Sequence, residues 1–151
     1  MTIPVLPMTG GCRCGAVRFR ITALPIVTSA CHCTGCQRMT ASAFSLSAAF
    51  PEGAFVITKG EPVIGGLHGP EARHHHCDHC KSWLFTRWGD MVNLRATMLD
   101  DPGWFEPFLE TWTREKLPWA STPAQHSFEE FPPMEAFGDL IAEYRRHLGD
   151  G

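Results

Sequence analysis

The sequence has no long apolar run and no concentration of basic residues. It contains no stretch of about 18 apolar residues, so it predicts no membrane-spanning helix. The 13 Lys and Arg residues are scattered among 16 Asp and Glu, and the formal net charge of −3 argues against a general nucleic-acid binder. We therefore expect neither a membrane nor a nucleic acid among the partners.

The sequence also lacks a recognisable secretory signal, internal repeats and low-complexity tracts. The N-terminal run MTIPVLPMTGGC has no basic region followed by an apolar stretch. We therefore expect a cytoplasmic protein, in a compartment where disulfides are rare. A chain of 151 residues forms one domain by default. At this length roughly 70% of the unfolded surface can be buried, which is enough for one core.

Cysteine carries the strongest signal in the sequence. Seven cysteines fall into three short motifs whose members are one or two residues apart: Cys12 and Cys14 in GGCRCG, Cys31, Cys33 and Cys36 in ACHCTGCQR, and Cys77 and Cys80 in HCDHCK. A disulfide framework is disfavoured because an odd count leaves one thiol unpaired and a Cys-x-Cys ring is strained. A thioredoxin-like redox pair is the remaining thiol alternative, but no strand–helix context supports it.

Thiolates at these spacings can reach one tetrahedral ion together, and their softness favours zinc. Seven ligands suggest a division into four and three. Four thiolates would close a structural site. Three would leave an open position, which is the arrangement of a catalytic site. The sequence therefore predicts two zinc ions per chain, one structural and one catalytic.

Many short strands separated by Gly and Pro turns predict a mainly β fold. Alternation in GAVRFRI, with Val17, Phe19 and Ile21 on one face, is typical of a half-buried strand. Similar patterns predict the further strands 26–28, 44–50, 55–58, 71–77, 83–86 and 91–94. Residues 112–131 are expected to form a long covering loop or an irregular strand.

After Pro132 and Pro133, apolar residues recur at helical spacing from Met134 to Leu148. Acidic residues come early and basic residues late, which suits the helix dipole. We expect an amphipathic helix docked on the core, with a homodimer contact as the alternative. The predicted organisation is a zinc-binding domain over 1–131, with 132–151 as its C-terminal helical extension.

The sequence resembles the glutathione-dependent formaldehyde-activating enzyme family, which also includes centromere protein V. The resemblance covers about residues 10–120 and rests on six blocks in the family's order: GGCRCGAVRF, ACHCTGCQRMTASAF, FPEGAFVITKGEP, HCDHCKSWLF, MLDDP and KLPW. It implies a β-tent fold with two zinc sites. It also implies a carbon–sulfur lyase that condenses formaldehyde with glutathione to S-hydroxymethylglutathione.

The resemblance also implies a role for each cysteine. The structural zinc would be held by Cys12, Cys14, Cys77 and Cys80, and the catalytic zinc by Cys31, Cys33 and Cys36. Lys81 replaces a glycine that the family usually has after the last cysteine, so the turn there is expected to be strained or altered.

A zinc ion with three thiolates is a weak Lewis acid and suits a soft fourth ligand. We therefore hypothesise that the open position takes the sulfur of a small thiol such as glutathione, and that this thiolate attacks formaldehyde. Arg38 is the expected nearby cation, with Gln37 and Thr40 as second-layer hydrogen-bonding candidates. His32, between two ligands on a strand, is expected to face away and to be structural.

The alternative class is a non-enzymatic zinc-stabilised binding module. In such a module a protein side chain, such as a histidine, would complete the second zinc site. The candidates are the run His74 to His76 and His79, although a partly exposed polar strand is the simpler interpretation of the run.

Overall fold

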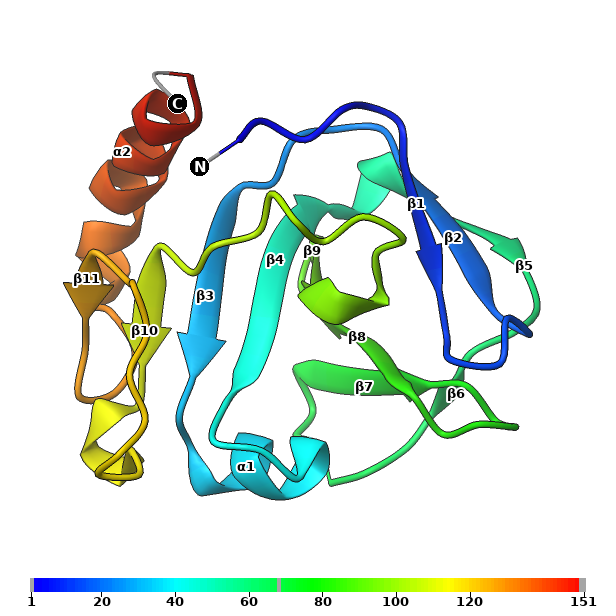
Figure 1. The fold of residues 1–151 in the computed structure, drawn as a ribbon, viewed down its shortest axis with the longest axis horizontal. Helices are drawn as coiled ribbons and strands as arrows, with labels where there is room; N and C mark the ends of the chain where they lie inside the picture. The colour runs from blue at the N-terminus through cyan, green and yellow to red at the C-terminus, as the bar shows by residue number, and fades with distance from the viewer. Residues whose placement is uncertain (1, 68, 150–151) are drawn as a thin grey trace.

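The structure is a computed structural model that describes residues 2–67 and 69–149 (Figure 1). Within these residues it has eleven strands: β1 (Met8–Gly11), β2 (Arg18–Ile21), β3 (Val27–Cys31), β4 (Ser45–Pro51), β5 (Phe55–Lys59), β6 (Val63–Ile64), β7 (Ala72–His76), β8 (Trp83–Trp88), β9 (Met91–Arg95), β10 (Leu109–Thr111) and β11 (His126–Ser127). The two α-helices are α1 (Thr34–Thr40) and α2 (Phe137–Gly149). The predicted mainly β fold class and C-terminal helix are confirmed.

The strands form two sheets. The small sheet has the order β1-β2-β5, and the large one runs β11-β10-β3-β4-β9-β8-β7-β6. Pairing is antiparallel except at one edge, where β10 is parallel to both β3 and β11. No helix in the described part of the chain is long and apolar enough to cross a membrane.

The main core draws its side chains from both sheets. The alternation predicted around Phe19 and Ile21 is confirmed, because both side chains are buried while Arg20 is exposed. They join Phe50 and Phe85 of the large sheet in one apolar cluster. This core fixes the small sheet against one face of the large sheet, and the opposite face stays available for polar side chains.

Helix α2 covers the β10 edge of the large sheet (Figure 1). Its apolar stripe, Leu140, Tyr144 and Leu148, packs on Phe108 and Leu109 in a second apolar cluster. Burial of a side chain of this size contributes about 1.5–3 kcal/mol. The helix therefore holds β10 in place beside β3, the strand that ends at Cys31.

Candidate metal centre and active site

The seven cysteines come together as two groups. In each group the sulfur atoms lie within 4.8 Å of one another. The four-cysteine group consists of Cys12, Cys14, Cys77 and Cys80, and the three-cysteine group of Cys31, Cys33 and Cys36. All seven thiols are free, so no disulfide competes with metal binding. Clustered thiols of this kind fit a thiophilic ion such as zinc.

The four-cysteine group joins the two sheets. Cys12 and Cys14 lie in the turn between β1 and β2, and Cys77 and Cys80 lie in the turn between β7 and β8. Cys14 Sγ is 3.8 Å from Cys77 Sγ although 63 positions separate them in the chain. Backbone amides of both turns point at sulfur: Val17 N donates to Cys12 Sγ at 3.3 Å and Cys80 N to Cys77 Sγ at 3.5 Å.

Each of these two turns contains one residue with a positive φ, and in the second turn that residue is Lys81, which departs from the family pattern. Gly15 has φ of 79° and Lys81 has φ of 61°. Lys81 therefore keeps the left-handed conformation that a glycine adopts without steric cost. Its amide donates to Cys77 O at 2.9 Å, so the turn closes in spite of the side chain.

The three-cysteine group lies where β3 passes into α1. Cys31 ends the strand, Cys33 is the N-cap of the helix and Cys36 lies within it. Cys33 Sγ accepts a hydrogen bond from the amide of Cys36 at 3.3 Å, so the sulfur also caps the N-terminus of the helix. All three residues are partly exposed, whereas Cys12 and Cys77 of the four-cysteine group are buried.

The three thiols share negative charge unequally. Hydrogen bonds from Cys31 and Cys36 lower the pKa of Cys33, while the same contacts raise the pKa values of Cys31 and Cys36. One thiolate therefore forms readily and discourages the next. A bound cation is the physical means by which all three would ionise together.

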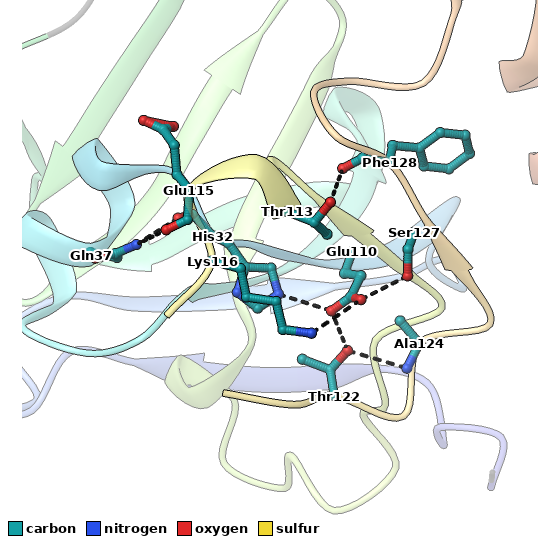
Figure 2. A network of polar contacts seen from close by, with 10 residues as sticks. All are labelled: His32, Gln37, Glu110, Thr113, Glu115, Lys116, Thr122, Ala124, Ser127 and Phe128. Atoms are coloured by element: carbon teal, nitrogen blue, oxygen red, sulfur yellow. Dashed lines mark hydrogen bonds and ion pairs between the residues drawn. The ribbon is translucent and has the colours of Figure 1, made fainter. Parts of the chain in front are cut away.

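His32 anchors the loop that carries the three-cysteine group (Figure 2). Its side chain is fully buried, and Nε2 lies 2.9 Å from Glu110 Oε2 of β10. Glu110 also accepts from Ser127 Oγ at 2.7 Å and Thr122 Oγ1 at 2.8 Å, and Lys116 Nζ lies 3.6 Å away. His32 thus faces away from the sulfurs, as the sequence predicted, but nothing in the sequence pattern identified Glu110.

Arg38, Gln37 and Thr40 all lie on α1, the helix that carries Cys36. Arg38 is exposed on α1, beside a shallow depression lined by Leu117 and Trp119. Gln37 Nε2 donates to the carbonyl oxygens of His32 at 2.8 Å and Glu115 at 3.0 Å. Thr40 Oγ1 donates to Cys36 O at 2.7 Å. The last two side chains therefore brace the loop.

The cation associated with the three-cysteine group in the structure is Arg95 of β9. It is 8% exposed, and its guanidinium carbon lies 4.1 Å from the ring centroid of Trp83. Burial lowers the pKa of Arg95 to about 10, and attraction from the thiols of the three-cysteine group opposes that shift. Sequence reasoning missed Arg95 because an arginine at the end of a half-buried strand is expected to point into solvent.

The histidines of β7 pack against aromatic rings. His75 is 7% exposed and stacks on Phe85 at 4.6 Å, whereas His74 and His76 flank the Trp83 ring. Among the described residues, no histidine nitrogen or carboxylate oxygen lies within 4.8 Å of all the sulfur atoms of either group. The three-cysteine group therefore has no fourth protein ligand of this kind in that part of the chain.

Comparison with known proteins agrees with the cysteine pattern. The family profile for glutathione-dependent formaldehyde-activating enzymes matches residues 7–115. The chain belongs to this family. A Halomonas elongata protein, whose name assigns it the same activity by inference, is 30% identical over 104 residues, covering 62% of this chain and 66% of that protein. The chain thus spans just under two thirds of that relative's length.

A solved structure supports the fold. The crystal structure of a Rhodobacter sphaeroides protein superposes with a TM-score of 0.53 at 19% sequence identity, over 62% of this chain and 88% of that one. At this identity the likeness supports the architecture alone. The family membership and the fold therefore agree, and activity has to be argued from the site.

Proposed function

We propose that the protein is a zinc-dependent carbon–sulfur lyase that condenses formaldehyde with glutathione to S-hydroxymethylglutathione in the cytoplasm. The observation that carries this proposal is the three-cysteine group, which is partly exposed and has no histidine, cysteine or carboxylate as a fourth ligand among the described residues. A closed structural site would be completed by the protein, whereas an incomplete one leaves room for substrate. The family's description names glutathione as the thiol and formaldehyde as the aldehyde.

The donor sets fit two zinc ions of different roles. The four-cysteine group would hold a structural ion, and the three-cysteine group a catalytic one. When bound at the latter, zinc supplies the charge that keeps a thiol ionised near neutral pH. On this proposal residues 1–131 form a β-tent zinc-binding domain, and 132–151 extend it.

The reaction needs one new bond and one proton. The thiolate sulfur of glutathione bonds to the formaldehyde carbon, the carbonyl π pair moves to oxygen, and a proton from water completes the hydroxymethyl group. The chain's own contribution is positional and electrostatic. The His32–Glu110 pair fixes the cysteine loop, and the positive charge of Arg95 offsets the negative charge that the sulfurs gather.

The proposed activity can be measured directly. Glutathione and ¹³C-formaldehyde equilibrate slowly without a catalyst, so exchange between free and bound carbon is followed by NMR. Zinc-replete protein is expected to accelerate this exchange, and Cys36→Ala to return it to the uncatalysed rate. Zinc-loaded protein that gives no acceleration would contradict the proposal and favour a zinc-stabilised binding module.

Metal content is a second expected result. Protein purified without chelator should hold up to two zinc ions per chain, and the four-cysteine group should keep its ion longer during titration with a chelator. A closed shell of sulfur ligands binds more tightly than an open one. Elemental analysis and a chromophoric chelator report both quantities. A metal-free protein with oxidised thiols would refute both zinc assignments.

A further inference from the structure

One face of the large sheet carries four buried polar atoms that have no hydrogen-bond partner. They are Ser45 Oγ, Arg95 Nε, Trp83 Nε1 and His76 Nδ1. Their residues lie on β4, β9, β8 and β7, which are consecutive neighbours in the sheet. Buried polar atoms in proteins are nearly always paired, so a row of four unpaired ones indicates a missing partner.

The row lies on the face opposite the main core. Ala48, Phe85 and Leu94 of these strands point into the apolar cluster between the sheets. Side chains alternate along a strand, so Ser45, Ser47 and Arg95 point the other way. The register pairs Ser47 with Arg95, and the guanidinium of Arg95 lies over Trp83, whose ring stacks with His76 at 6.4 Å.

Of the four residues in the row, Arg95 is the one for which a missing partner costs the most free energy, because it is charged. Its Nη2 donates to Asn93 O at 3.2 Å, and its other contact is the Trp83 ring. No carboxylate of the described residues forms an ion pair with it. A buried cation is expensive unless an anion and hydrogen bonds compensate it. The compensating anion is therefore expected to come from outside the chain or from the thiolates nearby.

The chemistry of the four atoms selects the kind of anion. Arg95 Nε and Trp83 Nε1 can only donate hydrogen bonds. Ser45 Oγ and His76 Nδ1 can also act as donors. A carboxylate accepts several hydrogen bonds and donates none, so it satisfies such a set. An ammonium group would meet two donor-only nitrogens and the like charge of Arg95.

The row begins at the three-cysteine group. Ser45 pairs with Cys31 in the strand register, and Arg95 lies opposite Ser47, two residues further along β4. Two residues of strand span roughly 7 Å. A ligand whose sulfur lies at the cysteines can therefore place a carboxylate that is several bonds away beside the guanidinium.

We propose that Arg95, together with Trp83, His76 and Ser45, binds a carboxylate of the thiol substrate. The assignment rests on the proposed function for the location of the sulfur. It makes the site selective for thiols that carry a carboxylate over neutral thiols of the same size. Glutathione offers two carboxylates, and the row holds one of them.

Calorimetric binding to zinc-replete protein, without formaldehyde, tests the assignment. The probes are glutathione and its dimethyl ester, which keeps the thiol but masks both carboxylates. Wild-type protein is expected to prefer glutathione. Arg95→Gln should weaken the binding of glutathione roughly 10- to 100-fold, the value of a charge-assisted hydrogen bond of about 1.5–3 kcal/mol, and the binding of the ester, which loses only the counter-charge for its sulfur, by clearly less. Equal weakening of both probes would overturn the proposal, because Arg95 would then act only as a counter-charge for the sulfurs.

Two further variants protect the test against misfolding and general charge effects. Trp83→Phe keeps an aromatic ring but removes one hydrogen-bond donor. It should weaken the binding of glutathione by roughly 2- to 10-fold and leave the binding of the ester unchanged. If both probes bind this variant as they bind wild type, the assignment fails even when Arg95→Gln cannot be folded. Arg20→Gln removes an exposed charge on the small sheet, so it should keep the full preference for glutathione.

S-methylglutathione separates this proposal from the proposed function, because it keeps both carboxylates but cannot offer a thiolate. Wild-type protein should bind it, and Arg95→Gln should not. If wild type binds S-methylglutathione no less tightly than glutathione, thiolate binding fails while the carboxylate subsite stands. If glutathione binds and its ester binds equally well, the subsite fails while the proposed function stands. Binding of no probe contradicts both.

Discussion

Cys77→Ala is expected to unfold the protein at temperatures where Cys36→Ala remains folded. The four-cysteine group connects turns of the two sheets that are 63 positions apart in the chain, whereas the three-cysteine group lies within one strand–helix junction. A metal ion bound at the former would close a long loop and fix the sheet packing, so its binding energy would be folding energy. A loss of about 5 kcal/mol would lower the melting temperature by roughly 10–20 °C.

Thermal melts of zinc-replete variants, followed by circular dichroism, provide the measurement. Cys14→Ala is the matched control for position: it is exposed, so it leaves no cavity, but it removes a sulfur from the same group. It should therefore melt as early as Cys77→Ala. Cys36→Ala should stay within about 5 °C of wild type and lose the formaldehyde exchange activity. A Cys36→Ala variant that melts well below Cys77→Ala would mean that the two metal roles are reversed.

The parts of the fold that follow from local pattern were predictable. The alternation around Phe19 and the helical spacing from Leu140 to Leu148 both depend on one buried face, and the structure has both. The parallel strand β10 was not predicted, because its pairing with β3 joins residues about 80 positions apart and its central residue is a buried acid. Helix α1 has no buried residue, so it lacks the apolar stripe that reveals a helix.

The same distinction applies to the site. The pairing of Cys12 and Cys14 with Cys77 and Cys80, across 63 positions, followed only from the family resemblance, but that the cysteines within each motif act together could be predicted from their spacing. The roles of Glu110 and Arg95 could not, since each is a charged residue whose burial depends on partners supplied by other strands. Arg38 lies two positions after Cys36 and is exposed on α1. Its proposed catalytic role stays a prediction.

Glu110→Ala is expected to destabilise the protein by about 3–5 kcal/mol, because it leaves several buried polar groups without their hydrogen-bond acceptor, at about 1–3 kcal/mol each. Glu110 is 7% exposed and receives contacts from His32, Ser127, Thr122 and Lys116 (Figure 2). Its loss leaves the fully buried His32 ring without a partner at Nε2. Chemical denaturation measures the difference, and the loosened loop should also bind metal at the three-cysteine group more weakly.

Another His–Glu pair among the described residues is a matched control. His126 Nε2 lies 3.0 Å from Glu143 Oε1, but these side chains are 31% and 42% exposed. Solvent screens such a pair, so Glu143→Ala should cost no more than about 1 kcal/mol. If the two alanine variants lose equal stability, burial is not what makes the Glu110 network important.

The pH dependence of the same network has a definite sign. Burial would raise the pKa of Glu110, but hydrogen bonds from Ser127, His32 and Thr122 and the charge of Lys116 outweigh it and lower the pKa to about 2. A carboxyl whose pKa is lower in the folded state stabilises the protein above its unfolded pKa of about 4.5, and this contribution disappears as the pH falls towards 2. The stability advantage of wild type over Glu110→Gln should therefore be constant near neutral pH and shrink between about pH 5 and 2. Paired denaturation curves across that range measure it, and an advantage that does not change with pH would show that Glu110 contributes through shape alone.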